Sequence, residues 1–417
     1  MTDGYPLTER RVLGLVAPRL ILSAHSIPVQ PIAAEIPVSS DSFHRYPFYS
    51  PRFWHGMRPL GWWALLRQGG FRIHPTRVPM ALAISFATFV NSCLAGIQFL
   101  FYARKLATAE LHNPPVFIIG HWRSGTTLLH ELLVLDARLS SPSTYQCFAP
   151  HHFLISEWFF RIFCRWLLPN QRPMDNMAAG WDRPQEDEFA LVNLGLPSPY
   201  RRIAFPNNPP PDLDYLDTET LAAERTARWT AALDRFLRCV SYRTGRPLVV
   251  KSPTHTGRIA TLAKAFPGAK FIHITRDPRN LFPSTVRLWK SLDEAQSLQR
   301  ATNESLEDYV IECLTRMYNA FHRDRDQVEP THLVDVRYED LIADPVGQLE
   351  WIYSQLRLGD FDYVRDAIGE WTETQHREYK TNRHQLPSDQ ESRILAAWQG
   401  YFQRYGYGPG EHQRQAQ

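Results

Sequence analysis

The stretch Val116-Phe-Ile-Ile-Gly-His-Trp-Arg-Ser-Gly-Thr-Thr-Leu-Leu129 decides the fold of this chain. Its first four residues are apolar and suit a strand, and Gly120 and Gly125 bound a turn that leads into a helix. A strand, a glycine turn and a helix in this order present backbone N–H groups to a phosphate or a similar anion. The glycine spacing matches the P-loop of ATP- and GTP-binding proteins, but Thr126 stands where that motif has lysine, and the basic residue is Arg123. The loop is therefore predicted to bind an anion, but not in the manner of an ATPase.

A second strand-to-helix turn lies in Lys270-Phe-Ile-His-Ile-Thr-Arg-Asp-Pro-Arg279. Arg276 follows the apolar strand, and Ser284 lies in the next helix, which Asp277 is expected to cap. Right-handed crossovers place the carboxyl ends of parallel strands at one edge of a sheet. Both turns are thus expected to meet at that edge, where one ligand can touch both.

Strands and helices alternate along the chain. The candidate strands are Val116–Gly120, Pro247–Lys251, Lys270–Thr275 and His332–Arg337. The candidate helices are Thr127–Leu135, Leu221–Cys239, Arg258–Phe266, Asn280–Trp289, Leu306–Arg325, Val346–Gln355 and Ser388–Tyr405. This alternation predicts an α/β fold with a parallel sheet flanked by helices on both faces. The last of the four strands is expected to be central and architectural, followed by a polar turn with Glu339 and Asp340.

Together the two turns resemble the donor-binding motifs of sulfotransferases, which use 3′-phosphoadenosine 5′-phosphosulfate (PAPS) as co-substrate. The first resembles the loop around the 5′-phosphosulfate, and the Arg276-to-Ser284 spacing resembles the clamp on the 3′-phosphate. The likeness covers roughly residues 115–408 and is nearest to the broad bacterial-type group. It implies a P-loop-like sulfotransferase fold, PAPS as donor, no metal, and sulfonate transfer to a hydroxyl or amine of a small-molecule, lipid or carbohydrate acceptor.

The resemblance also implies which residues bind the donor. The residues expected at the 5′-phosphate are Arg123, Ser124, Gly125, Thr126, Thr127 and Leu128. Arg123 would also stabilise charge that develops on the leaving phosphate. Arg276 and Ser284 would bind the 3′-phosphate, and Lys251 at the end of another strand would reach the sulfonate or the leaving oxygen.

A late basic segment, Tyr379-Lys-Thr-Asn-Arg-His384, resembles the part of the family that closes over the 3′-phosphate. Lys380 or Arg383 would serve there, and a solvated basic loop is the structural alternative.

The acceptor hydroxyl needs a general base, and several candidates stay open. His255 lies near the position of the histidine of cytosolic family members, but Pro253 occupies the aligned place. Protein-tyrosine and bacterial relatives use a glutamate where this chain has Gln146, which cannot accept a proton. His151 and His152 follow closely and are further candidates.

The acidic run Pro184-Gln-Glu-Asp-Glu-Phe189 adds Glu186 and Glu188 as candidate bases, with Asp187 less favoured. Its structural alternative is a solvated helix start, because acidic residues favour the first turn of a helix.

Composition sets further bounds. The chain has 417 residues, enough for a large domain and an extension. A net charge of +3 is too small to indicate nucleic-acid binding. The scattered cysteines are Cys93, Cys147, Cys164, Cys239 and Cys313. They form no CxxC pair, which disfavours a disulfide framework or structural zinc and indicates a reducing compartment. With no signal-peptide pattern at the start, the chain is expected to be cytoplasmic.

Residues 1–112 are predicted to form an extension and residues 113–417 the sulfotransferase domain. Within the extension, Val78–Tyr102 contains no charged residue and is long enough to span a bilayer, but Asn91 and Gln98 interrupt it. Three interpretations stay open: a helix packed on the catalytic domain, a helix in the membrane interface, and a true span.

Peripheral membrane contact would involve residues 53–105, where tryptophans and arginines flank the apolar run. The aromatic stretch Tyr145 to Trp166 is expected to line an apolar acceptor pocket together with the N-terminal region. Aromatic residues make up 12% of the chain, and of the two explanations, a dense core and an apolar acceptor pocket, the core is favoured.

Two other functions remain. A P-loop kinase or NTPase would need Mg²⁺-dependent ATP binding, and the loop lacks the lysine of that class. A non-catalytic, membrane-associated nucleotide-binding relative finds support in Gln146, which replaces a familiar base.

Overall fold

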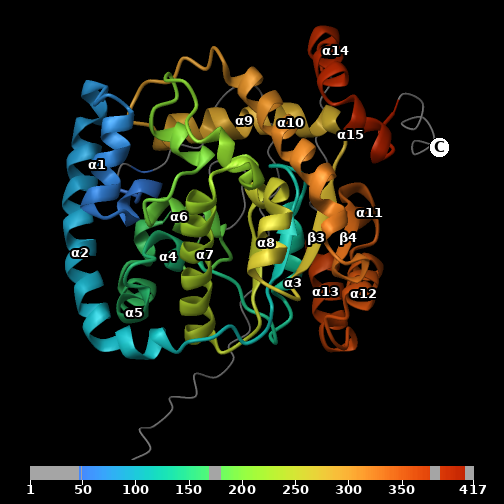
Figure 1. Cartoon of the computed structure of the whole chain (residues 1–417), viewed down its shortest axis with the longest axis horizontal. Coiled ribbons are helices and arrows are strands. Elements are labelled where there is room, and N and C mark those ends of the chain that lie inside the picture. Colours follow the sequence, from blue (N-terminus) through green and yellow to red (C-terminus); the bar gives the residue numbers. More distant parts are fainter. Residues whose placement is uncertain (1–46, 48, 169–179, 376–385, 409–417) are drawn as a thin grey trace, which may run out of the picture. The chain divides into compact units, whose positions relative to one another are not determined.

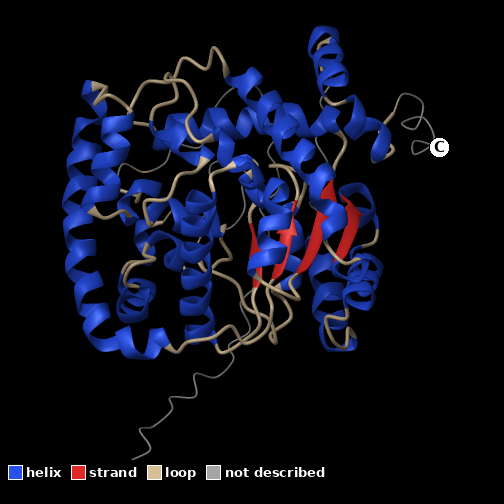
Figure 2. Ribbon diagram, in the orientation of Figure 1, coloured by secondary structure: helices blue, strands red, loops and turns tan. Residues whose placement is uncertain are grey.

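Four short parallel strands form the sheet (Figure 2). They are β1 (Val116–Ile119), β2 (Val249–Lys251), β3 (Lys270–Thr275) and β4 (Leu333–Arg337). The computed structural model describes residues 47, 49–168, 180–375 and 386–408. Within them the strand order is β2-β1-β3-β4, and every neighbouring pair is parallel. The α/β architecture predicted from the sequence is confirmed.

Helices cover both faces of the sheet, as buried parallel strands require. Along β1, Phe117 belongs to one buried cluster and Ile118 to another, because successive side chains of a strand point to opposite faces. The helices on the Ile118 side are α3 (Thr126–Leu133), α11 (Tyr338–Ala343), α12 (Pro345–Leu356) and α13 (Asp362–Gln375). The helices on the Phe117 side are α7 (Ala223–Thr244), α8 (Ile259–Ala265) and α10 (Leu306–Asp324).

The turn after β3 forms as predicted. The side chain of Asp277 accepts a hydrogen bond from the backbone N–H of Arg279 at 2.9 Å and so caps α9 (Pro278–Gln296). The helix runs through Pro283 and continues past the predicted end at Trp289. The predicted helix Ser388–Tyr405 divides at Trp398 into α14 (Ser388–Ala397) and α15 (Gln399–Arg404).

β4 lies at the edge of the described sheet, and the prediction of a central strand is wrong. Among the described strands it pairs with β3 alone. An apolar strand has the same sequence pattern whether one neighbour or two complete its hydrogen bonds, so the pattern could not decide its place. The polar turn after it contacts the turn after β3, because Glu339 Oε1 accepts from the N–H of Asp277 at 3.0 Å.

Three helices between β1 and β2 were not predicted: α4 (Thr144–Phe148), α5 (Phe153–Phe163) and α6 (Asp187–Asn193). Short helices contain too few turns for a helical period to show in the sequence. They carry the aromatic stretch and the acidic run.

The apolar segment of the extension forms the 30-residue helix α2 (Val78–Ala107), which packs beside α1 (Pro59–Gln68), α5 and α7 (Figure 1). Asn91 Nδ2 donates to the carbonyls of His55 and Met57 at 2.7 and 2.8 Å. Gln98 Nε2 donates to the carbonyl of His151 at 3.0 Å. The polar residues that interrupt the apolar run are therefore the ones that face the protein.

Candidate active site

The loop after β1 has a backbone that only glycine accommodates at two positions. Gly120 has φ +144°, and a Cβ there would lie 2.4 Å from the carbonyl oxygen of Ile274. Gly125 has φ +102°, and a Cβ there would lie 2.4 Å from the ring of Tyr338. Arg123, with φ +67°, adopts the left-handed region that non-glycine residues seldom occupy. The loop is thus held in one curved conformation by close packing on β3 and α11.

Hydrogen bonds inside the protein hold the same loop. The N–H of Gly120 donates to Thr256 Oγ1 at 2.8 Å, and Ser124 Oγ donates to the carbonyl of His121 at 2.7 Å. His121 Nδ1 donates to the carbonyl of Trp122 at 2.9 Å, and burial lowers the pKa of this histidine to about 3. The ring is therefore neutral, and the positive charge of the loop belongs to its arginine.

α3 begins directly after this turn, with Gly125 at its cap position. The first N–H groups of a helix have no partner within the helix, and the helix dipole adds positive potential there. Thr126 and Thr127 contribute hydroxyls to the same first turn. This arrangement suits a phosphate or sulfonate group.

The two turns meet at the sheet edge. Arg123 Nε donates to Ser284 Oγ of α9 at 2.9 Å, and Arg276 Nη1 donates to the carbonyl of Arg123 at 3.0 Å. The guanidinium of Arg276 also lies 4.4 Å from the ring centroid of Tyr338. The structure therefore brings together the residues expected at the 5′-phosphate and those expected at the 3′-phosphate.

A lysine joins the donor loop to one carboxylate of the acidic run. Lys251 Nζ, at the end of β2, lies 2.6 Å from Glu186 Oε1 and 3.3 Å from Thr127 Oγ1. Tyr200 OH donates to Glu186 Oε2 at 2.5 Å and receives the indole N–H of Trp122 at 2.6 Å. Burial and the nearby Glu186 charge raise the pKa of Tyr200 well above its usual value, so the phenol remains a donor. The carboxylate is held from both sides, yet its side chain is 13% exposed.

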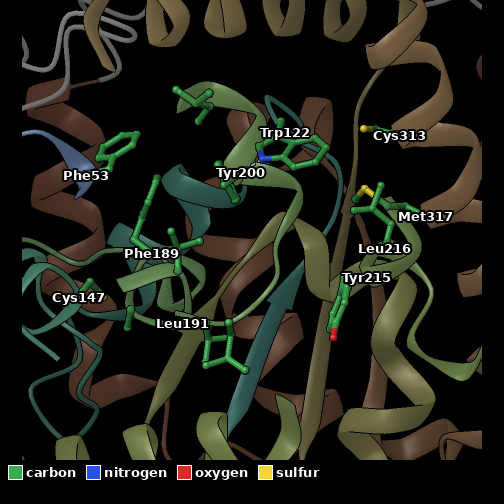
Figure 3. Close-up of a cluster of buried hydrophobic side chains, with 14 of the residues drawn as sticks. Phe53, Trp122, Cys147, Phe189, Leu191, Tyr200, Tyr215, Leu216, Cys313 and Met317 are labelled. Atoms are coloured by element: carbon green, nitrogen blue, oxygen red, sulfur yellow. Dashed lines mark hydrogen bonds between the residues drawn. The ribbon is translucent and has the colours of Figure 1, made fainter. Parts of the chain in front are cut away.

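Trp122 and Tyr200 had no expected role. Figure 3 shows both side chains in the buried cluster, with Phe189 of α6 nearby. Neither residue lies in a motif that indicates contact with the acidic run, because the contact joins segments far apart in the chain.

The other two carboxylates of the run are wholly buried. Asp187 Oδ2 lies 2.8 Å from His255 Nε2, and Glu188 Oε2 lies 2.6 Å from Arg258 Nη1. Burial raises the pKa of Glu188, but the charge and hydrogen bonds of Arg258 outweigh it and hold the pKa below its usual value. The solvated helix start expected as the structural alternative is thus not what these two residues form. They tie α6 to η7 (Pro253–Arg258) instead.

The histidines at the start of α5 contact other helices. His151 Nε2 lies 3.1 Å from the carbonyl of Asn193 in α6, and His152 Nε2 lies 3.1 Å from Asn91 Oδ1 in α2. Burial lowers the pKa of both histidines to about 4. Gln146 forms the capping box of α4. Lys380 and Arg383 lie outside the described residues.

The aromatic stretch expected to line an acceptor pocket divides into two parts. Tyr145 and Phe153 are buried in the core, whereas Trp158, Phe163 and Trp166 are more than half exposed. Its C-terminal part therefore contributes apolar surface.

A sheet edge of this kind is typical of α/β proteins that bind phosphorylated ligands at the carboxyl ends of their strands. Residues 114–363 match the Sulfotransferase family. The chain is also 42% identical over 369 residues to omega-hydroxy-beta-dihydromenaquinone-9 sulfotransferase Stf3 of Mycobacterium bovis and of Mycobacterium tuberculosis, covering 88% of this chain and 95% of either relative. The chain therefore belongs to the sulfotransferase family.

Solved structures agree at the level of the fold. Sulfotransferase STF1 from Mycobacterium tuberculosis H37Rv superposes with a TM-score of 0.56 at 16% identity, over 85% of this chain and 94% of that one. Sulfotransferase STF9 from Mycobacterium avium gives a TM-score of 0.54 at 16% identity, over 84% and 96%. Family membership favours sulfonate transfer over the phosphoryl transfer that the glycine spacing alone allowed.

Proposed function

We propose that this sulfotransferase moves a sulfonate from PAPS to the terminal hydroxyl of an apolar lipid of the isoprenoid-quinone class. The observation that carries the proposal is Lys251 Nζ between Glu186 and Thr127, at 2.6 and 3.3 Å, because it joins a carboxylate to the donor loop. The acceptor class follows from the relatives named for a hydroxylated dihydromenaquinone, which are 42% identical.

The residues at the sheet edge fit the donor. The tight contacts at Gly120 and Gly125 fix the loop that leads into the first turn of α3, where the 5′-phosphate would sit. Ser284 Oγ accepts from Arg123, so its own proton is free for the 3′-phosphate beside Arg276. PAPS supplies the activated sulfonate when bound.

Glu186 is the proposed general base. It accepts the proton of the acceptor hydroxyl, while Lys251 and Tyr200 hold its two oxygens in place. Lys251 also carries positive charge to Thr127, where negative charge grows as the S–O bond breaks. In this proposal His151, His152 and His255 take no part in proton transfer, because each is already held by a partner within the protein, at Asn193, Asn91 and Asp187 in turn.

Two measurements test the proposal. The purified chain should be stabilised thermally by 3′-phosphoadenosine 5′-phosphate (PAP), by roughly 2.7 kcal/mol at a hundred times the dissociation constant, and not by ATP with Mg²⁺. Incubation with PAPS and an ω-hydroxylated isoprenoid quinone should give the sulfate ester by mass spectrometry, and the quinone without the hydroxyl should give no product. Stabilisation by ATP and Mg²⁺ alone would refute the donor, and equal turnover of hydrophilic alcohols would refute the acceptor class.

A further inference from the structure

α1 and α2 expose an unusual amount of apolar surface. The exposed apolar side chains of this face, called the α1–α2 face below, are Leu60, Trp63, Phe71, Val78, Leu82, Phe86, Phe89, Val90, Ile97, Phe99, Leu100 and Phe101. Leu60, Phe86 and Leu100 are 86%, 72% and 80% exposed. Single exposed apolar residues are ordinary, but a continuous group marks a surface that meets another apolar phase.

A helix on the surface of a soluble domain usually turns its apolar side chains toward the core, whereas α2 exposes many of them. At about 100° per residue, its exposed apolar members from Val78 to Phe101 fall within a stripe roughly 200° wide. The opposite side carries Thr88, Asn91 and Gln98, all buried. The same side also buries Ala81 and Ile84, so the core accounts for those two apolar residues but not for the outward stripe.

The basic residues around the α1–α2 face indicate which partner it binds. Residues 49–109 contain no aspartate or glutamate. The exposed basic side chains in this range are Arg58, Arg67, Arg72, Arg104 and Lys105. A second copy of the chain would bring like charges together, whereas anionic lipid headgroups attract them. Exposed Trp63 suits the boundary between headgroups and acyl chains.

The inner side of α2 is bound to the rest of the protein. These contacts favour a helix that lies on a membrane over a helix that crosses it. The helix Pro75–Ala107 is long and apolar enough to span a bilayer, with 22% of its most apolar window buried. However, Asn91 and Gln98 anchor it to backbone groups of the domain. We propose that the α1–α2 face docks on an anionic bilayer, with α2 parallel to the surface.

A short series of packed helices links the α1–α2 face to the candidate active site. α2 contacts α5, α5 contacts α4, and α4 packs on α6, which begins directly after Glu186. Docking would thus hold the site beside the phase in which an isoprenoid acceptor dissolves. In this respect the inference rests on the proposed function, but vesicle binding needs neither donor nor acceptor.

The test is co-sedimentation of the full chain with vesicles of phosphatidylcholine, with and without phosphatidylglycerol. Wild type should bind the anionic vesicles more tightly, and high salt should weaken that binding. The double variant Phe86→Ser/Leu100→Ser should lose at least about tenfold in vesicle affinity, since two buried side chains are removed from lipid. Trp351→Ser, at an apolar residue of α12 that is 40% exposed, is the matched control and should bind as wild type.

PAP stabilisation of each variant reports whether the fold and the donor site are intact. Equal vesicle binding by wild type and the folded double variant would overturn the proposal. So would a wild-type dimer in light scattering that the double variant abolishes, because the face would then join two copies. If the wild-type protein binds anionic vesicles but does not sulfate the quinone with PAPS, the proposed donor or acceptor is refuted. The docking proposal then still stands, because vesicle binding needs neither.

Discussion

The sheet edge and the α1–α2 face use polar groups in opposite ways. At the sheet edge, the cationic side chains bind groups of the two turns: Lys251 contacts the hydroxyl of Thr127, Arg123 that of Ser284, and Arg276 the carbonyl of Arg123. On α2, Asn91 and Gln98 turn inward as anchors, and large apolar side chains such as Phe86 and Leu100 face outward. In our proposals the first region holds a small anion and the second meets a broad apolar phase.

The two regions differ in how much of their function a local sequence pattern can predict. A phosphate loop acts through its own consecutive backbone groups, so its function is local. An apolar helix has several possible environments, and only the side on which its polar residues are bonded selects among them. Changes at the sheet edge should therefore affect chemistry and donor binding, and changes on the α1–α2 face should affect membrane binding.

The largest expected effect is that of Glu186→Gln. Removing the proposed base should lower kcat about 10³-fold, or ~4 kcal/mol, because general-base catalysis contributes roughly 10²–10⁴-fold. PAP stabilisation and vesicle binding should stay as in wild type. The control is Glu350→Gln, at an exposed glutamate of α12 paired with Arg365, which should leave kcat unchanged. Activity within a few fold of wild type in the Glu186 variant would disprove the base assignment.

Gly125→Ala tests the rigidity of the donor loop. A side chain at φ +102° is strained and would overlap the Tyr338 ring, so we expect a loss of ~3 kcal/mol in the free energy of unfolding. Gly245→Ala is a matched control, because that residue has φ +67° and nothing within 4 Å of its Cβ position. It should cost only about 1 kcal/mol. Equal losses in chemical denaturation would show that the Tyr338 contact does not constrain the loop.

Arg276→Ala tests the proposed 3′-phosphate site. Losing a charged contact should weaken PAP binding about 100-fold, or ~2.7 kcal/mol, by calorimetric titration. Arg316→Ala removes an exposed arginine paired with Glu312 on α10 and should bind PAP as wild type. If both variants retain wild-type affinity, the 3′-phosphate lies elsewhere.

The buried contact of His152 with α2 predicts how stability depends on pH. Burial lowers its folded pKa from 6.5 to about 4, so it is neutral in both states above pH 6.5. As the pH falls toward 4, the unfolded chain gains a proton that the folded chain does not. His152 should therefore contribute about 2 kcal/mol to the fall in the free energy of unfolding between neutral pH and pH 5. His152→Gln should reduce that pH-dependent loss by the same amount, and an unchanged slope would contradict burial as its cause.

Much of the sheet edge could be predicted. The bounds of β3 agree with the predicted Lys270–Thr275, and Lys251 stands at the end of its predicted strand. These features depend on short apolar runs and on turn chemistry, which are local. The roles of Glu186, Asp187 and Glu188 could not be separated, because adjacent carboxylates look alike until distant residues choose their partners.

The parallel sheet, the glycine loop and the second basic turn could all be read from the amino-acid sequence, because they follow from apolar periodicity and from glycine geometry in consecutive residues. Only the tertiary structure decided that β4 lies at an edge, that Glu186 is the carboxylate joined to the loop, and that α2 turns its apolar side outward. Each of these depends on contacts between segments far apart in the chain. The free energy of such contacts depends on both segments, so neither segment alone predicts it.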